Sequence, residues 1–325
     1  MEKDTKPRVL YVLKLLETYS DEQHPMTFAQ LSALLKEQYD ITAHRTTLQR
    51  DLDELTAFGV DIIAIRSTQN RFFIGSRVFE TPEIRLLSDA IGSSKCLTEK
   101  KSAELIEKLG SLMSIHQAAA LKERPMPTTV NKPKNENIYY IIDAINRAIE
   151  LGRSIRFSYI DYTPDKQPVL RGDGEVYHLS PYACMWSGDF YYVIGWSHKR
   201  HDIAAFRIDR IAATPDVAEE AIIPPPAGFD LCDYSRSVFH MYKGTEVVVE
   251  LQCRNDLMKT MIDRFGEDAH TEILDENSFK VTAPVSLSPT FYGWIFEFGG
   301  KIRLLSPQTA IDEYRHMVLN AAEQL

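Results

Sequence analysis

The sequence predicts an α+β protein built from several domains. Its 325 residues suffice for two or three separate hydrophobic cores, and its hydrophobic content of 44% is that of an ordinary globular chain. Leucine and valine recur at helical spacing near the N-terminus, whereas aromatic and apolar residues form short strand-like runs in the middle of the chain. A polar, proline-containing stretch separates these two patterns and indicates a linker.

The first quarter of the sequence predicts three short helices. They cover residues 7–19, 26–39 and 42–59. The second helix opens with a capping box, because Gln30 follows Thr27 by three residues. Thr42 is the expected N-cap of the third helix, and Gly59 suits its C-terminal end.

Two short strands follow the third helix. Residues 60–66 and 71–75 are mostly apolar, and residues 67–70 (Ser-Thr-Gln-Asn) have the composition of a hairpin turn. Three helices and a hairpin predict a winged helix-turn-helix domain over residues 1–78. A small helical domain with a solvated third helix is the alternative interpretation of the same pattern.

The third helix carries the side chains of a DNA reader. Residues 42–50 include two arginines and one histidine but no acid, and the acids come only in the later turns. Arginine and glutamine can form paired hydrogen bonds with base edges, while threonine and the helix start can meet phosphate. The predicted DNA-binding residues are Arg45, Thr46, Thr47, Gln49, Arg50 and, in the wing, Arg71.

The net charge of the chain is -9, but a DNA-binding surface depends on local charge. Residues 1–78 contain ten basic and eleven acidic residues, a balance of -1, so the remaining -8 lies elsewhere. The chain has no secretion signal and no run of about 18 apolar residues, and its four cysteines are scattered. We therefore expect a cytoplasmic protein with reduced thiols and no membrane contact.

A helical connector is predicted over residues 79–135. One helix opens at Thr81 and a second at Thr98. Residues 122–137 then hold three prolines and four lysines or arginines with few apolar residues, which is typical of an extended linker. This composition predicts a domain boundary near residue 135.

The middle segment, residues 136–222, predicts an SH3- or Sm-like β-barrel. An amphipathic helix stops at Gly152 and is followed by apolar, aromatic runs. The expected strands are residues 154–161, 175–186, 189–196 and 203–208. His198, His201 and Asp202 lie in a basic loop that disfavours a cation, so we expect neither a metal nor a cofactor.

Two regions of the sequence resemble known regulator families. HRTTLQRDLDELTAFGVDI resembles the recognition helix and wing entry of DeoR-type regulators, and Arg71 departs from the glycine often found in their wing. The matching positions are Thr47, Leu48, Arg50, Asp51 and Leu52. The stretches SIRFSYI, LSPYACMWSGDFYYVIGW and AAFRIDRI resemble the WYL-domain family of bacterial transcription regulators. The Trp-Tyr-Leu triplet is here Phe190-Tyr191-Tyr192, and the Arg-x-x-Arg ending is kept as Arg207 and Arg210.

The WYL resemblance implies a ligand-sensing barrel with a basic, aromatic-edged pocket for an anionic nucleotide or nucleic-acid-type effector. Guanidinium groups pair with phosphate and aromatic faces stack on bases, so the residue types agree. The implied ligand-binding residues are Tyr159, His178, Ser180, Tyr182, Tyr191, Arg207 and Arg210. Two simpler alternatives stay open: Arg207 could pair with Asp209 or Asp202, and one residue of the pair Tyr191 and Tyr192 could belong to the core.

The last hundred residues predict a ferredoxin-like domain over residues 223–325. The pattern is strand–helix–strand–strand–helix–strand with a final helix after Pro307. The segment resembles the C-terminal extension of WYL regulators at Trp294, Gly299 and Pro307. This resemblance implies contacts in a homodimer.

Together these features predict a homodimeric, ligand-responsive transcription regulator that reads a pseudo-palindromic double-stranded DNA operator. We expect it to be a repressor of a nearby operon of phage defence or DNA damage, with activation as the alternative. No convergent carboxylates or nucleophile–base pair is evident, so we do not expect an enzyme. An accessory nucleic-acid-binding protein without operator specificity is the competing prediction.

Overall fold

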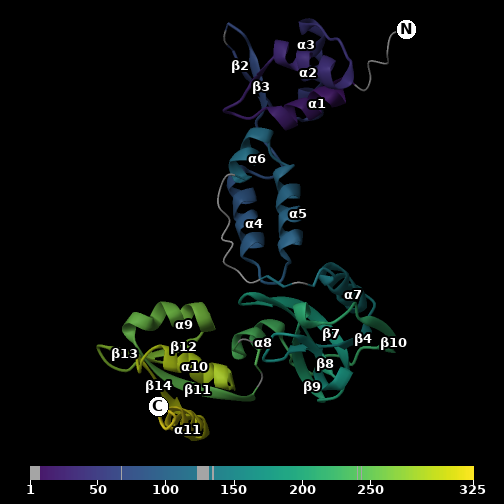
Figure 1. The fold of residues 1–325 in the computed structure, drawn as a ribbon. Helices are drawn as coiled ribbons and strands as arrows, with labels where there is room; N and C mark the ends of the chain where they lie inside the picture. The colour runs from purple at the N-terminus through teal and green to yellow at the C-terminus, as the bar shows by residue number, and fades with distance from the viewer. Residues whose placement is uncertain (1–7, 67, 123–131, 134, 240, 243) are drawn as a thin grey trace. The chain divides into compact units, whose positions relative to one another are not determined.

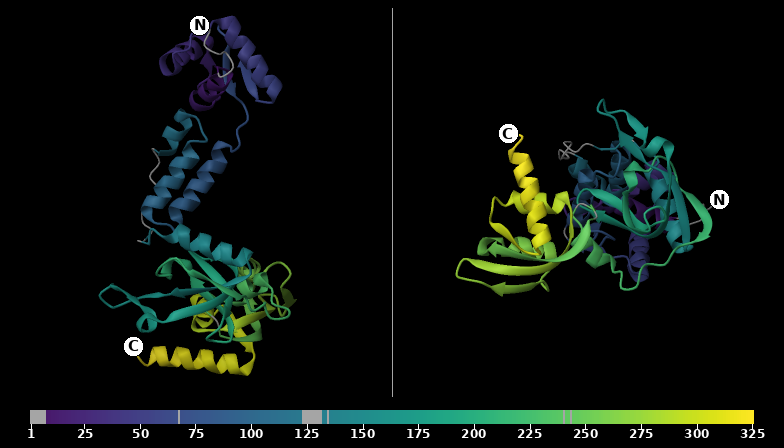
Figure 2. Two further views of the ribbon diagram at one scale, coloured as in Figure 1. Left: turned by 90° about the vertical axis from the view of Figure 1, so that its right-hand side faces the viewer. Right: turned by 90° about the horizontal axis from the view of Figure 1, so that it is seen from below.

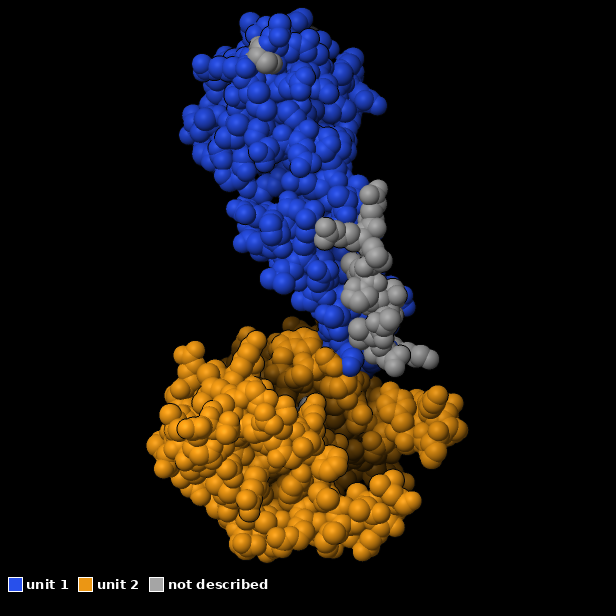
Figure 3. Space-filling view, turned by 90° about the vertical axis from the view of Figure 1, so that its left-hand side faces the viewer, with its two compact units in different colours: residues 1–136 blue, residues 137–325 orange. Residues whose placement is uncertain are grey.

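The computed structural model describes residues 8–66, 68–122, 132–133, 135–239, 241–242 and 244–325 of the α+β chain (Figure 1). It divides into two compact units, residues 1–136 and 137–325 (Figure 3). The boundary predicted near residue 135 lies next to this division. Most of the predicted linker, residues 123–131 and 134, lies outside the described residues. No described helix has both the length and the apolar character needed to cross a membrane.

The first unit begins with three helices and a small antiparallel sheet. The elements are α1 Arg8–Tyr19, β1 Met26–Thr27, α2 Phe28–Tyr39, α3 Arg45–Phe58, β2 Ile62–Ile65 and β3 Arg71–Ile74. The sheet order is β1-β3-β2, and the sequence did not predict the short strand β1. Leucines at helical spacing, such as Leu16, Leu31 and Leu48, are fully buried in one core with Phe72 of β3.

The ends of the helices show one confirmed and one wrong prediction. Thr27 and Gln30 form the predicted capping box at the start of α2. The third helix, however, begins at Arg45 with His44 as N-cap, and not at Thr42. Ala43 is buried and its carbonyl accepts a hydrogen bond from the Ser32 hydroxyl at 2.9 Å, which keeps the chain out of the helix up to His44.

A buried ion pair fixes α3 against α1. Arg8 donates to both carboxylate oxygens of Asp51, at 2.7 and 2.8 Å. The side chain of Asp51 is only 3% exposed, so water cannot replace Arg8 as the partner of its carboxylate. Asp51 therefore has a structural role in holding the third helix, although its sequence neighbours were predicted to face DNA.

Three helices make up the connector. They are α4 Thr81–Ser93, α5 Glu99–Gly110 and α6 Ile115–Lys122, of which α6 was not predicted. Their core is small and contains Ile84, Ile106, Met113 and Leu121. Buried Ser88 and Gly92 on α4, and Ser102 and Gly110 on α5, leave room for the two helices to approach closely.

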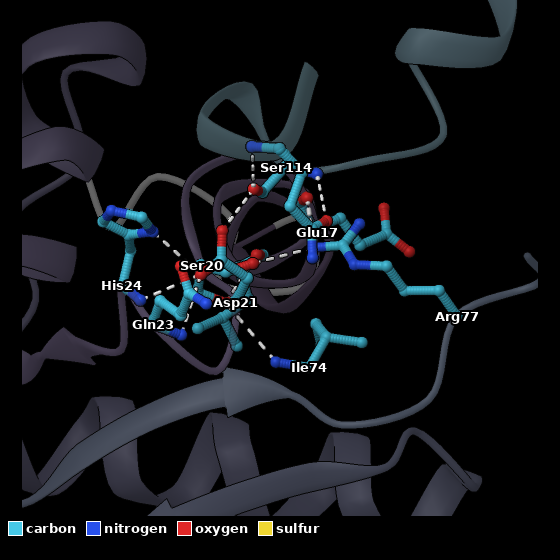
Figure 4. A network of polar contacts seen from close by, with 10 residues as sticks. Glu17, Ser20, Asp21, Gln23, His24, Ile74, Arg77 and Ser114 are labelled. Atoms are coloured by element: carbon cyan, nitrogen blue, oxygen red, sulfur yellow. Dashed lines mark hydrogen bonds and ion pairs between the residues drawn. The ribbon is translucent and has the colours of Figure 1, made fainter. Parts of the chain in front are cut away.

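Asp21, in the turn after α1, joins the three-helix part to the connector (Figure 4). Its carboxylate is buried and accepts hydrogen bonds from the Ser114 hydroxyl and from Nδ1 and the backbone N–H of His24. The His24 ring also stacks on His116 of α6, with ring centroids 3.9 Å apart. Burial alone would raise the pKa of Asp21, but the hydrogen bonds from Ser114 and His24 outweigh it and hold this pKa below its ordinary value.

Arg77, just before α4, also links the three-helix part to the connector (Figure 4). Its guanidinium donates to the carbonyls of Glu17 at 2.7 Å, Ser20 at 2.8 Å and Leu112 at 3.4 Å. These carbonyls belong to the end of α1 and to the segment that leads into α6. One arginine thus satisfies backbone groups of two separate segments and ties them together.

The second unit begins with a helix on a five-stranded antiparallel sheet. The sheet order is β10-β4-β7-β8-β9, and helix α7 Ile138–Glu150 packs on it. The strands are β4 Arg153–Ser158, β7 Val176–Ser187, β8 Phe190–Ser197, β9 Asp202–Arg207 and β10 Asp216–Ala221. After β9 a 3-10 turn, η2 Ile208–Arg210, brings Ile211 into a bridge with Tyr159. This bridge places the end of β9 beside the end of β4.

Three further elements of this sheet region were not predicted. Strand β10 is one, and the hairpin of β5 Ile160–Tyr162 and β6 Pro168–Leu170 is another. Helix α8 Leu231–Ser237 is the third. Tyr234 and Val238 pack on Tyr192 and Ile194, so α8 and the residue after it cover one face of β8.

The C-terminal segment has the predicted element order. Its elements are β11 Thr245–Arg254, α9 Met258–Phe265, β12 His270–Ile273, β13 Ser278–Leu287, α10 Pro289–Glu297, β14 Ile302–Ser306 and α11 Gln308–Ala322, the last in yellow in Figure 2. The sheet is antiparallel in the order β12-β13-β11-β14. Met261, Phe291 and Ala310 from three helices share one core with Val249 and Phe279, so the helices cover the same face of the sheet.

Breaking the Arg8–Asp51 pair should destabilise the first unit strongly. Arg8→Ala leaves a buried carboxylate without its partner, which typically costs roughly 3–5 kcal/mol. Urea unfolding of the full chain measures this as a loss of stability in the transition that reports on α1 and α3. The double variant Arg8→Met/Asp51→Leu removes both charges and should recover most of the loss. Equal instability of the single and double variants would contradict the argument.

The hydrogen bonds of the buried Asp21 carboxylate predict a specific change in acid stability. Because the folded-state pKa of Asp21 lies below its unfolded value, Asp21 stabilises the fold above the ordinary carboxyl range, and this stability is lost as pH falls through the folded pKa. Ser114→Ala removes one hydrogen bond, raises this pKa and should move acid unfolding to higher pH. The control Ser111→Ala removes an exposed serine that bonds only within its own helix end. Identical acid midpoints for Ser114→Ala and wild type would contradict the assignment.

Candidate functional site

The predicted DNA-binding side chains lie on the first two turns of α3 and at the start of β3. Arg45, Thr46 and Arg50 are exposed on α3, Thr47 and Gln49 are half-buried, and Arg71 is exposed at the start of β3. The guanidinium of Arg45 lies 5.6 Å from the centre of the Phe28 ring at the start of α2. Since α3 begins at Arg45, its first-turn backbone N–H groups lie beside these side chains and favour a phosphate.

Two of these side chains are paired with acids one turn later on the same helix. Gln49 donates to Asp53 at 2.9 Å, and Arg50 donates to Glu54 at 3.1 Å. The Arg50 side chain is 79% exposed, so this ion pair is worth little and a phosphate or base can displace it. The helix therefore presents basic and amide groups that are free to be redirected.

Arg207, the first arginine of the Arg-x-x-Arg ending, is held on two sides. Its Nε and Nη2 donate to the two carboxylate oxygens of Asp209, at 3.1 and 2.7 Å. Its guanidinium carbon lies 3.3 Å from the centre of the Phe190 ring. Burial alone would lower the pKa of Arg207, but the bond to Asp209 outweighs it and raises this pKa. The pairing with Asp209 that the sequence left open is thus present.

Tyr159 contacts Arg171 and Arg207, and Arg210 affects its pKa. Its hydroxyl accepts a hydrogen bond from the backbone N–H of Arg207 at 3.0 Å, and burial raises its pKa to about 12. The guanidinium of Arg171 lies 5.0 Å from the Tyr159 ring and donates to Asp161 at 2.7 Å. The charge of Arg210 lowers the pKa of both Tyr159 and Asp161 in part, so it lies within electrostatic range of both groups.

We call Arg171, Arg207 and Arg210 the arginine cluster. Two of its three charges are balanced inside the protein, because Arg171 pairs with Asp161 and Arg207 with Asp209. Within the described part of the chain, Arg210 has neither a hydrogen bond nor an ion pair. The cluster therefore keeps a net charge of +1, from three arginines less two aspartates, in a chain of net charge -9.

The register of β8 and β9 places Tyr191 on the face of the sheet opposite to the side chain of Arg207. Arg207 is paired with Tyr192 in the ladder, and paired residues share a face of the sheet. Tyr191 points to the opposite face, where its ring lies 5.0 Å from Trp186. The tyrosine of β8 that meets Arg207 is therefore Tyr192, whose pKa is raised mainly by burial and is lowered in part by Arg207.

His178, Ser180 and Tyr182 form a separate group on β7. The Tyr182 hydroxyl donates to the carbonyl of Ile223, and the Ser180 hydroxyl accepts from the Ile223 backbone N–H, both at 2.9 Å. Ser180 is fully buried and also contacts Nε2 of His198 at 2.9 Å. Ser180 and Tyr182 hold the chain that leaves β10, while His178 contacts the Ser154 hydroxyl of β4 at 2.9 Å. No contact joins these side chains to the three arginines among the described residues.

The rings of His178 and His198 stack on each other with centroids 3.6 Å apart. Burial lowers the pKa of both rings; Arg156 lowers that of His178 further, and His178 lowers that of His198. Two cationic rings in this arrangement would repel each other, so the stack favours neutral imidazoles. This pair supports the fold near neutral pH and is a poor anion site.

Three residues of the candidate site were missed from the sequence. Arg171 follows the unpredicted hairpin β5–β6, so no predicted strand placed it near Tyr159. Phe190 and Tyr192 were treated only as parts of an aromatic triplet. The alternation of side chains along β8 could have found them, because both share the face of Arg207 once the register is known.

Comparison with known proteins agrees with the assignment of the second unit. Residues 140–214 match the WYL domain, and residues 244–322 match the WCX domain. These matches support a WYL-domain regulator. No curated protein sequence matches the chain.

Two solved structures are similar to most of the chain. Proteasome accessory factor B/C (PafBC) of Arthrobacter aurescens is 16% identical over 94% of this chain, with a TM-score of 0.30, and this chain covers 45% of its length. A CRISPR Cas-related protein is 12% identical over 98% of this chain and 84% of its own, with a TM-score of 0.35. Both likenesses are too distant to transfer a function or an arrangement of units.

The stacked histidines should titrate below the ordinary histidine pKa of 6.5. Because their folded-state pKa values are lowered, the stability that they contribute is present above 6.5 and is lost as pH falls through the folded values. NMR titration of the imidazole signals measures both values. Arg156→Gln should raise the pKa of His178 part of the way back. Titration of both rings at or above 6.5 in the wild type would contradict the stacked, buried arrangement.

Proposed function

We propose that the protein is a homodimeric transcription regulator that reads a pseudo-palindromic operator and senses an anionic nucleotide or nucleic-acid-type ligand. The observation that carries this proposal is the arginine cluster around Tyr159 within the segment that matches the WYL domain. Repression is the proposed sign of regulation.

The arginine cluster supports an anionic ligand by its charge and its surroundings. Arg210 supplies the positive charge that the protein does not balance among the described residues, and Arg207 adds a guanidinium held flat on Phe190. A planar guanidinium binds phosphate oxygens in pairs, and the aromatic residues beside it are suited to a base. With a net charge of +1, the cluster best matches a singly charged group such as one phosphodiester.

The first unit supports DNA reading by a winged helix-turn-helix. Helix α3 presents Arg45, Thr46 and Arg50 to solvent, and the acids of the helix lie in later turns or, like Asp51, are buried. The hairpin of β2 and β3 places Arg71 beside a loop, as expected for a wing. In a two-fold dimer, two such helices would read half-sites one or more helical turns apart.

Binding of ligand and operator must be coupled for the protein to act as a sensor. Such coupling is typically about 1–3 kcal/mol, which corresponds to a change of about 5- to 150-fold in affinity, and it is reciprocal. The second unit would bind the ligand, and the first would bind the operator. Asp21 and Arg77 support a rigid connection between the connector and the reading helices.

A nuclease footprint on the DNA upstream of the protein's own gene tests the proposed operator. We expect a protected palindrome for the wild type, and each lost arginine contact should cost about 1–3 kcal/mol of binding. Arg45→Ala/Arg50→Ala should therefore abolish protection. Arg207→Ala/Arg210→Ala is the matched control, since it removes the same number and type of side chain from the other unit and should leave the palindrome protected.

The competing function, an accessory protein without operator specificity, predicts a different outcome. Such a protein would bind duplexes of any sequence with similar affinity at a given salt concentration, and it would leave no footprint. Loss of protection in both double variants would contradict the separation of reading from sensing.

A further inference from the structure

The side chain of Arg207 is fixed more completely than its two neighbours in the arginine cluster. Its backbone N–H is bonded to the Tyr159 hydroxyl, its flat face lies on Phe190 at 3.3 Å, and one edge is taken by Asp209. Its side chain is 19% exposed, whereas that of Arg171 is 38% exposed. A guanidinium held by an aromatic ring and a carboxylate has little freedom left to lose when it binds a ligand.

One edge of this guanidinium makes no hydrogen bond to the described residues. A guanidinium has five N–H donors, and Asp209 takes one on Nε and one on Nη2. The other edge, formed by Nη1 and Nη2, has no acceptor among the described residues. Two parallel N–H groups on one edge match the two oxygens of a phosphate group.

We propose that Phe190 and Asp209 are positioning residues that hold Arg207 so that its Nη1–Nη2 edge receives the anionic group of the ligand. Phe190 fixes the plane of the guanidinium by a cation–π contact. Asp209 fixes its rotation within that plane and balances its charge while no ligand is bound. This inference rests on the proposed sensing function and adds the residues that prepare the site.

The same contacts allow an opposite role for Asp209. A carboxylate that occupies Arg207 could compete with the ligand as an internal anion. The geometry favours positioning, because Asp209 covers the Nε edge and leaves the Nη1–Nη2 edge uncovered among the described residues. The two roles predict opposite effects of removing the charge of Asp209, so one substitution separates them.

The test is the equilibrium affinity of the full chain for a short fluorescent oligothymidylate at fixed salt concentration. Phe190→Leu keeps an apolar side chain but removes the ring, and it should weaken binding about tenfold, as expected for loss of a partly buried cation–π contact. Phe190→Trp keeps a ring and should bind like the wild type. Asp209→Asn keeps the shape but loses the charge, and it should also weaken binding about tenfold.

Two matched controls separate positioning from general effects. Phe229→Leu removes a ring from the same face of the sheet, where Phe229 packs on Tyr182 and Tyr234 without an arginine. Asp216→Asn changes the net charge equally at an exposed position at the start of β10. Both should bind the oligonucleotide as the wild type does. A merely structural role for Phe190 would make Phe190→Trp fail along with Phe190→Leu.

The outcomes distinguish this inference from the proposed function. If the wild type does not bind, or if Arg210→Ala binds equally well, the proposed sensing site fails and the inference fails with it. If Arg210→Ala weakens binding but Phe190→Leu and Asp209→Asn bind normally, only the inference is overturned. Tighter binding by Asp209→Asn would overturn it too and would make Asp209 a competitor of the ligand.

Discussion

The pairing of β8 with β9 determines the candidate ligand site of this protein. Arg207 lies opposite Tyr192, so the face of Phe190 and Tyr192 becomes the face of the arginine. Immediately afterwards the chain leaves extended geometry in η2, which lets Asp209 turn back to Arg207 and lets Arg210 approach Tyr159. A shift of one residue in this register would place Tyr191 beside Arg207 and separate the guanidinium from the Phe190 ring.

A comparable constraint acts in the first unit through buried polar groups. The pair of Arg8 and Asp51 holds α3, and the bonds of Asp21 and Arg77 hold the connector. Each of these charges is satisfied by a partner from another element, so the orientation of the elements is specified rather than merely favoured by apolar packing. A rigid connection of this kind would suit the DNA-reading role that we propose for α3.

Much of the secondary structure was predictable from local patterns, but the site depended on long-range pairing. The capping box of Thr27 and the helix end at Gly59 follow from local chemistry and were found. The start of α3 was misplaced because Ser32, eleven residues before Ala43, holds the preceding segment. Arg207 and Arg210 were identified, whereas Arg171 reaches Tyr159 only through a hairpin that no apolar pattern marked. Tyr191 was predicted from the family resemblance, and a single strand does not reveal whether Tyr191 or Tyr192 shares a face with Arg207.

The central claim is that ligand bound in the second unit changes DNA binding by the first. Its most direct test is the affinity of the full chain for the operator DNA, measured with and without saturating oligothymidylate. We predict a change of about 5- to 150-fold in the wild type and none in Arg207→Ala/Arg210→Ala. An operator affinity that stays the same in the wild type, while the oligonucleotide binds, would show that the two units are not coupled and would contradict the account.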